Sequence, residues 1–250
     1  MKEIAAPGNL SNSDKTNKGY DKYIWFSLGA LLGMFVLIMM LLFHISFMVM
    51  IRFVLLNVVS IFLPGIAALS LFQIRLSRTA SVCCAYALGT VLVIIEYFFS
   101  EIFDREIPFV VVTICVAVLS GIFLLNKRKK NEKILLFLKA EGEIISLLCL
   151  AAFLCLGIFA YSANYPGPNV GKVIVTAHDL QYWCNNTVAL KIAFPPSNLF
   201  MSGTSLTYHY FSGIPIAFLS EVYNIDVFTL SFPLYSFAKA LTMVGRSYSY

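Results

Sequence analysis

Long apolar runs with few charged residues alternate with short polar segments along this chain of 250 residues. Each run holds about 20 residues, which is the length that a helix needs to cross the hydrocarbon core of a bilayer. Seven runs can be delimited, at 24–43, 53–72, 79–99, 109–125, 144–161, 206–223 and 227–244. The pattern predicts an all-α, polytopic transmembrane helical bundle with about seven spans.

Composition supports a lipid environment. Hydrophobic residues make up 59% of the chain and charged residues only 12%, whereas a soluble domain averages about 45–50% apolar and about 25% charged residues. Too little polar surface is left to cover a water-exposed globule, so the lipid bilayer is the expected partner. The formal net charge is +5, but the basic residues lie between apolar runs, so no nucleic acid is expected as a partner.

Basic residues set the expected orientation, because Lys and Arg are retained in cytoplasmic loops. If each run crosses once, the N-terminal lysines, the loop at 73–78 and the segment at 126–133 all fall on one side. The acidic turn at 100–108 falls on the other side. We therefore expect a multi-pass protein of the cell membrane with a cytoplasmic N-terminus.

The same count leaves one large loop on the outer side, at residues 162–206. Its four prolines exclude a single long helix. Within the loop, residues 177–194 carry apolar side chains at helical spacing, which predicts an amphipathic helix in the headgroup layer.

The organisation divides the chain into four parts. They are a disordered cytoplasmic tail (1–22), a five-helix transmembrane region (23–161), the outer loop (162–206) and two further membrane helices (207–250). Lys239 lies inside the last apolar run, which breaks the pattern that the earlier runs obey. We therefore expect the chain to be a fragment whose last helices begin a longer bundle.

Ionisable residues at membrane depth are candidates for function, because their burial in lipid is costly. Glu96 lies near the outer end of the third run. From there its side chain can snorkel to the interface, and we expect that position rather than a functional one. Lys239 is a second candidate.

The outer loop carries the main candidates for chemistry. His178 and Asp179 open the amphipathic segment, and His209 lies just before the sixth run. A carboxylate beside a histidine can act as a general base on a hydroxyl group, and with His209 the pair could hold a divalent metal ion. The candidate catalytic residues are Asp179, His178 and His209, and the candidate substrate-binding residues are Tyr182, Trp183, Tyr208 and Tyr210.

A structural explanation of the same residues stays open. Asp179 can cap the helix that follows it, since Asp is a favoured N-cap. The tyrosines and Trp183 can form an interfacial aromatic belt. The sequence has no phosphate loop, GxGxxG context, serine-nucleophile elbow or metalloprotease motif, and its six cysteines show no disulfide or zinc spacing.

Three segments within residues 178–220 carry a family resemblance: HDLQYW, AFPPSNLFMSG and LTYHYFSGIPIAFLS. With them the chain resembles polytopic membrane glycosyltransferases of the C-type fold, including protein mannosyltransferase-like and related uncharacterised bacterial membrane families. The resemblance implies an enzyme that transfers sugar from a polyprenyl-phosphate-linked donor on the outer face of the membrane. It also implies that Asp179, with His178 beside it, serves as the base or helps to hold a metal.

Two other classes of function stay open. A transporter or flippase component would need polar groups near the bilayer midplane. A non-catalytic membrane scaffold would use the outer loop only to bind a partner.

Overall fold

The computed structural model describes residues 10–103, 107–137, 147–156, 178–196 and 211–234. Nearly all of these residues are helical, which confirms the all-α class. Four helical stretches are long and apolar enough to cross a membrane: Tyr23–Leu42, Phe47–Phe72, Arg78–Ile102 and Phe109–Lys129. They correspond to the first four predicted spans, so a membrane helical bundle is supported, whereas seven spans are not shown.

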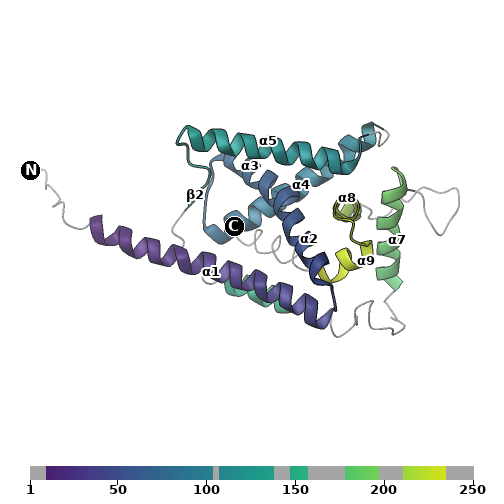
Figure 1. Ribbon diagram of the computed structural model, residues 1–250, viewed down its shortest axis with the longest axis horizontal. Coiled ribbons are helices and arrows are strands. Elements are labelled where there is room, and N and C mark those ends of the chain that lie inside the picture. The colour runs from purple at the N-terminus through teal and green to yellow at the C-terminus, as the bar shows by residue number, and fades with distance from the viewer. Residues whose placement is uncertain (1–9, 104–106, 138–146, 157–177, 197–210, 235–250) are drawn as a thin grey trace, which may run out of the picture.

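The first span lies within a longer helix, α1 (Leu10–Leu42). This helix runs along one side of the molecule, beside the short apolar helix Leu147–Leu156 (Figure 1). Ten described residues of the predicted fifth span are therefore helical. Leu150 and Leu154 of that helix join the buried core.

The second span is one continuous helix with an irregular turn in its middle. It consists of α2 (Phe47–Asn57), a five-residue π-helix η1 (Val58–Phe62) and α3 (Leu63–Phe72). Pro64 has no N–H group, so the carbonyl four residues earlier loses its helical partner, and the π-turn accommodates this defect. The π-turn thus lies directly before the turn that contains the proline.

The helix also begins earlier than the run of residues 53–72 indicated. Ser46 caps it, and its side-chain oxygen accepts a hydrogen bond from the Val49 N–H at 3.4 Å. The predicted run begins directly after the charged residue Arg52. The helix nevertheless includes Arg52, which donates to the carbonyls of Tyr223 and Asn224.

Helix α4 (Arg78–Ile102) packs against η1 and α3 at a point where the two backbones almost touch. A Cβ atom on Gly65 would lie 1.8 Å from the Ala85 carbonyl oxygen, and one on Gly89 would lie 2.0 Å from the Ile61 carbonyl oxygen. Only glycine leaves room for such an approach. Small residues at helix contacts are typical of membrane bundles, where close van der Waals packing drives association.

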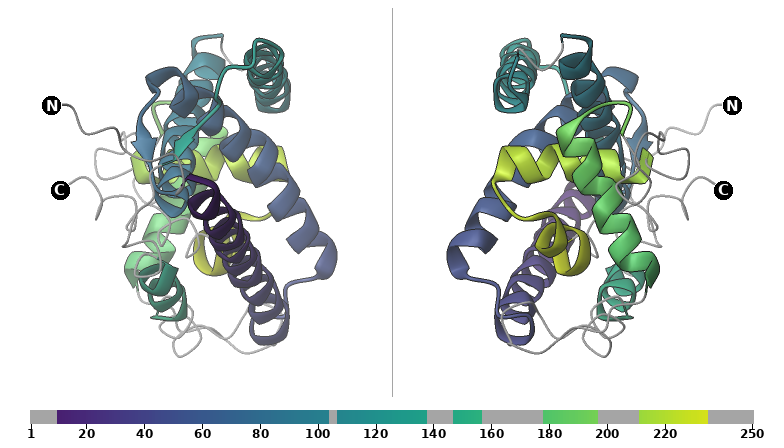
Figure 2. Two further views of the ribbon diagram at one scale, coloured as in Figure 1. Left: turned by 90° about the vertical axis from the view of Figure 1, so that its left-hand side faces the viewer. Right: turned by 90° about the vertical axis from the view of Figure 1, so that its right-hand side faces the viewer.

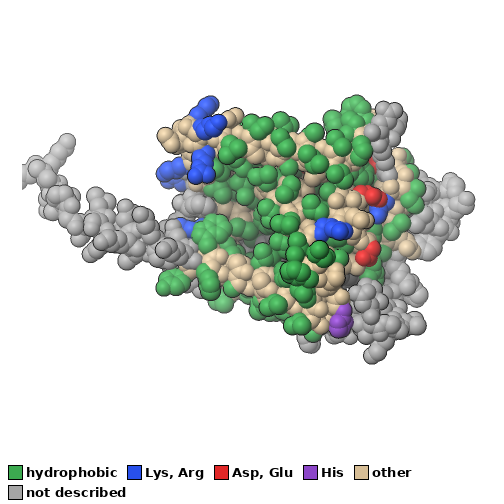
Figure 3. Space-filling view, viewed as in Figure 1, with side chains coloured by type: hydrophobic (Ala, Val, Ile, Leu, Met, Phe, Trp, Pro, Cys, Tyr) green, Lys and Arg blue, Asp and Glu red, His purple; other side chains and the backbone are tan. Residues whose placement is uncertain are grey.

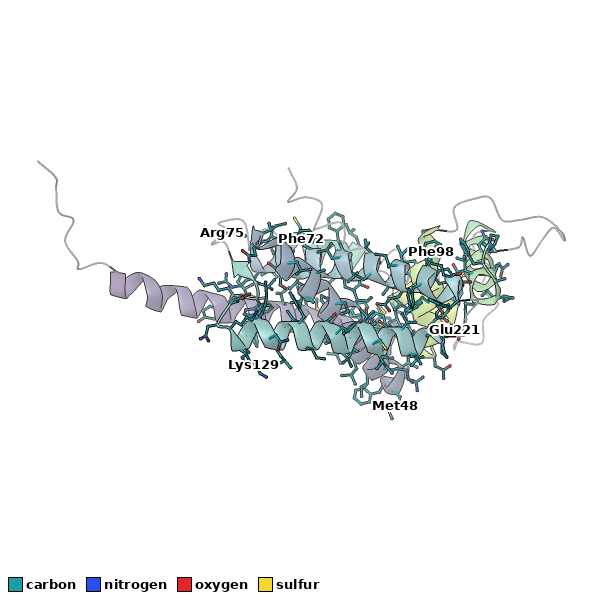
Figure 4. All side chains as sticks on the ribbon, turned by 90° about the horizontal axis from the view of Figure 1, so that it is seen from above. Met48, Phe72, Arg75, Phe98, Lys129 and Glu221 are labelled. Carbon is teal, nitrogen blue, oxygen red and sulfur yellow. The ribbon has the colours of Figure 1, made fainter. Side chains whose placement is uncertain are left out.

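The basic loops meet at one end of the bundle, where helix α5 (Phe109–Lys129) ends beside α3. The Lys127 ammonium group donates to the Ser70 carbonyl at 2.6 Å. Two short strands, β1 (Arg75–Leu76) and β2 (Leu136–Phe137), pair in parallel close by. Figure 4 shows Arg75 and Lys129 at this end and Glu221 at the opposite end. We call these the basic end and the α7 end.

Two helices close the α7 end: α7 (His178–Ile192) and α8 (Ile214–Tyr223). Figure 1 shows α8 end-on while α5 runs across the picture, and Figure 2 shows α8 lengthwise beside α7. Residues Ile214 to Ser220 of α8 are all buried. The sixth predicted span, 206–223, is not shown: its described part holds the ten-residue helix α8, which lies crosswise inside the protein.

One short element precedes α8 and two follow it. A 3-10 turn, η3 (Phe211–Gly213), leads into α8, and α9 (Val227–Thr229) continues as the π-helix η4 (Leu230–Leu234). The helical segment starts at Val227, where the seventh span was predicted, after an Asp226 cap that accepts from the Thr229 N–H at 2.8 Å. Lys239 lies outside the described residues.

The outer surface of the candidate spans is apolar (Figure 3). Large hydrophobic side chains on α1, α4 and α5 are exposed, among them Leu41, Ile95, Val118 and Leu119. A soluble monomer rarely exposes an apolar surface of this extent. The exposed faces therefore suit contact with lipid chains.

The glycine contact generates the first prediction. Gly65→Ala and Gly89→Ala each place a methyl group against a backbone carbonyl, and overpacking of this kind costs about 1–3 kcal/mol or more. We expect both variants to unfold at a lower temperature in detergent, by several degrees. Gly33→Ala and Gly121→Ala are matched controls, because nothing lies within 4 Å of a Cβ atom at either position. An equal effect of all four substitutions would contradict the close contact.

Candidate functional site

The structure places part of the predicted outer-loop site. His178 and Asp179 open helix α7, and Tyr182 and Trp183 follow in the same helix, so a helix is present where one was predicted. Its amphipathic character and its place in the headgroup layer stay predictions. Asp179 lies in the first turn, where the helix dipole favours a carboxylate. The side chains of these four residues lie outside the described part of the structure. His209, Tyr208 and Tyr210 lie outside it altogether, so their approach to Asp179 stays a prediction.

Helix α7 is fixed to the bundle through its C-terminal half. The Tyr97 hydroxyl of α4 donates to the Leu190 carbonyl at 2.9 Å, and both side chains are fully buried. The ring of Tyr97 also packs edge-on against Phe194, with centroids 6.0 Å apart. Thr187 faces α8, because a Cβ atom on Gly213 would lie 2.8 Å from the Thr187 hydroxyl oxygen.

An ion pair joins the end of α7 to α8. Lys191 Nζ lies 3.2 Å from a Glu221 carboxylate oxygen and donates to the Ser220 hydroxyl at 3.1 Å. Ser220 in turn donates to the Ile225 carbonyl at 2.7 Å. Both charged side chains are partly exposed, so the pair stabilises the contact by about 1 kcal/mol at most.

A cavity of about 240 Å³ opens beside this pair. Its walls come from the end of α4, the start of α5, α7 and α8, and are formed by Ser100, Ile107, Pro108, Phe109, Val110, Lys191 and Glu221. One ammonium group and one carboxylate at its edge give the cavity a polar side, while α5 supplies an apolar wall. The cavity can therefore hold a small molecule with both characters.

The cavity and the predicted catalytic pair lie at opposite ends of α7. His178 precedes Lys191 by thirteen residues, which corresponds to about 20 Å along a helix at ~1.5 Å per residue. A single small substrate cannot contact both. They are separate parts of the surface at the α7 end.

Buried polar groups connect α8 to the candidate spans. The Ser60 hydroxyl of η1 is 2.7 Å from the Tyr223 hydroxyl and donates to the Leu56 carbonyl at 2.6 Å. Arg52 donates to the Asn224 carbonyl at 3.1 Å, where α8 ends. The Ser60–Tyr223 pair is buried, so its bonds satisfy hydroxyl groups inside the core, whereas the Arg52 bond lies at the exposed end of α8.

Glu96 was expected at the interface, and this expectation was wrong. Its side chain is only 3% exposed, and one carboxylate oxygen accepts a hydrogen bond from the Thr113 hydroxyl of α5 at 3.2 Å. The other oxygen, Oε1, has no hydrogen-bond partner among the described residues. The cause is helical geometry, which turns Glu96 toward α5 instead of toward lipid.

Sequence reasoning missed the Glu96–Thr113 and Lys191–Glu221 pairs. Each joins residues that are 17 or 30 positions apart and belong to different helices. The signal available for the first pair was Thr113, one of two hydroxyl residues within the apolar run 109–125. That signal does not name its partner.

Metal and thiol chemistry find no additional support in the described residues. They contain no group of three or more His, Cys, Asp or Glu side chains that could hold a metal ion. Burial raises the pKa of the Cys184 thiol in α7 to about 11. The thiol is therefore protonated at neutral pH and is a poor nucleophile.

Comparisons with known proteins do not extend these observations. The chain matches no protein-family model, and no match is found among the curated proteins or the solved structures. The described residues thus form a helical bundle with four helical stretches long and apolar enough to cross a membrane, and with a crosswise helix and a surface helix at one end.

The attachment of α7 can be tested through Tyr97. Tyr97→Phe removes the hydrogen bond to Leu190 and keeps the ring packing, at a cost of about 0.5–1.5 kcal/mol. We expect amide hydrogen exchange in the last turns of α7 to accelerate roughly fivefold, as a local opening cost ~1 kcal/mol lower implies. Tyr86→Phe is the control, since its hydroxyl donates to Asn57 at 3.4 Å, away from α7. Unchanged exchange in α7 for Tyr97→Phe would exclude an anchoring role.

Proposed function

We propose that this protein is a multi-pass protein of the cell membrane that acts as a glycosyltransferase on its outer face. The sugar donor is a polyprenyl-phosphate-linked sugar. The basic end lies in the cytoplasm, in keeping with the retention of Lys and Arg on that side. The α7 end then faces outward.

The position of α7 is the observation that carries the proposal. It is a surface helix at the end opposite the basic loops, and it opens with His178 and Asp179. The family that the chain resembles uses an acidic residue in an outer loop as its base or metal ligand. In this sequence Asp179 is the residue at the matching position.

The chemistry assigned to Asp179 follows from the reaction. An acceptor hydroxyl must lose its proton as its oxygen attacks the anomeric carbon, and the bond from that carbon to the lipid phosphate breaks. A carboxylate near the hydroxyl takes up the proton, and His178 beside it can assist. A divalent ion held with His209 would stabilise the departing phosphate, and this ion stays a prediction.

Substitution of Asp179 tests the enzyme assignment. We expect Asp179→Asn to lower the release of polyprenyl phosphate from a radiolabelled polyprenyl-phosphate-sugar donor by about 10²–10⁴-fold in proteoliposomes, the usual contribution of a general base. Asp21→Asn, the same change in α1 near the basic end, should leave the rate unchanged. Equal rates for the wild-type protein and Asp179→Asn would exclude the assignment, and equal membrane insertion of all three proteins serves as the control for folding.

The buried Glu96 favours a second candidate, a proton-coupled transporter or flippase component. A carboxyl group inside a membrane bundle, with one oxygen unpartnered among the described residues, is the type of group that proton relays use. The Ser60–Tyr223 hydroxyl pair is also buried inside the bundle.

Proton flux separates the two candidates. For a transporter, vesicles loaded with a pH-sensitive dye should show flux through the protein under an imposed pH gradient, and Glu96→Gln should reduce that flux at least ~10-fold. Glu132→Gln, an exposed acid at the basic end, is the matched control. Equal flux in protein-free vesicles and in wild-type vesicles would eliminate this candidate and leave the transferase proposal unaffected.

A further inference from the structure

The basic end of the bundle carries a cationic surface that two separate segments of the chain form together. The loop 73–78 and the segment 126–137 together contain seven Lys and Arg residues and one acidic residue, Glu132. Arg75, Arg128, Lys129, Lys130 and Lys133 are all exposed. We call these five exposed cations the basic patch. Figure 3 shows basic side chains gathered at this end, away from the acidic side chains near α7.

Backbone geometry holds the α5 part of the patch in place. Helix α5 ends with Asn131 in the left-handed conformation, at a φ of 56°. The Asn131 N–H donates to the Arg128 carbonyl at 3.0 Å, and the Glu132 N–H donates to the Lys127 carbonyl at 3.0 Å. This is the hydrogen-bond pattern of a Schellman motif, which ends a helix and reverses the chain.

The reversal brings the basic segment beside β1. Strand β2 pairs with β1 in a register that matches Arg75 with Leu136. Lys127, which is buried, fixes α5 to α3 through its bond to the Ser70 carbonyl. Cations from two distant segments of the chain are thus fixed at one end of the bundle.

Apolar side chains surround the basic patch on the membrane side. Leu71, Phe72 and Ile74 precede β1 and are 64%, 62% and 51% exposed. Ile122 and Leu125, in the last turns of α5, are also exposed. A cationic surface that continues directly into exposed apolar side chains matches the boundary between headgroups and acyl chains of a bilayer leaflet.

We propose that the basic patch binds the headgroups of anionic phospholipids in the leaflet at this end. The charge complementarity is strong, and the adjoining Leu71, Phe72 and Leu125 can contact the acyl chains of the same lipid molecules. A nucleic acid or an acidic soluble protein would use the cations but not this apolar border. Lysine and arginine clusters next to a spanning helix have this affinity for anionic leaflets.

Lipid titration of the detergent-solubilised protein tests the proposal. Native mass spectrometry counts the bound molecules of phosphatidylglycerol and, in parallel, of zwitterionic phosphatidylcholine. We expect a preference for phosphatidylglycerol that disappears at high salt, where charge interactions are screened. The triple variant Arg128→Gln, Lys129→Gln, Lys130→Gln should lower the phosphatidylglycerol affinity on the order of 100-fold, since each cation contributes roughly fivefold.

A second triple variant controls for total charge. Lys15→Gln, Lys18→Gln and Lys22→Gln remove the same charge from the start of α1 and should leave the lipid preference intact. An equal loss in both triple variants would overturn the proposal, because net charge alone would then explain binding. A wild-type protein without lipid preference would also overturn it, and if that protein retained a short RNA or an acidic peptide, the patch would belong to that partner instead.

Discussion

The backbone contact between η1–α3 and α4 determines the arrangement of the other helices. Gly65 faces the Ala85 carbonyl, and Gly89 faces the Ile61 carbonyl, so each glycine meets the carbonyl four residues before the other glycine. The contact is therefore reciprocal and fixes both the distance and the rotation of the two helices. In lipid, burial of apolar side chains gives little driving force for such pairing, and close packing with hydrogen bonds replaces it.

The polar bonds of the bundle extend from this pair of helices. The π-turn before Pro64 places Ser60 against Tyr223, and Arg52 donates to the carbonyls at the end of α8. Helix α8 is thereby held crosswise against the spans. It then supports α7 through Lys191, while α4 supports α7 directly through Tyr97. Each bond joins elements far apart in the sequence.

Hydrophobic run length predicted the first four spans well, because it measures whether a segment can cross a bilayer. It also predicted the start of the segment at Val227, while the helical spacing of apolar residues predicted the helix of α7. It does not distinguish an apolar segment inside a protein, such as α8, from one inside lipid, and it failed for Glu96, since run length does not report the direction of a side chain. The catalytic candidates are predicted only to the level of their helix, because the side chains of His178 and Asp179 lie outside the described residues, as does all of His209.

Two acids with different surroundings support the two functional proposals, and α4 connects them. A general base must meet its substrate, so Asp179 suits that role only on a surface helix. Glu96 has no such access, and its burial suits exchange of a proton with neighbouring hydroxyls instead. Tyr97 follows Glu96 directly in α4 and is the residue that donates to Leu190 in α7. The attachment of α7 and the position of the buried carboxyl group thus both depend on α4, through two adjacent residues of that helix.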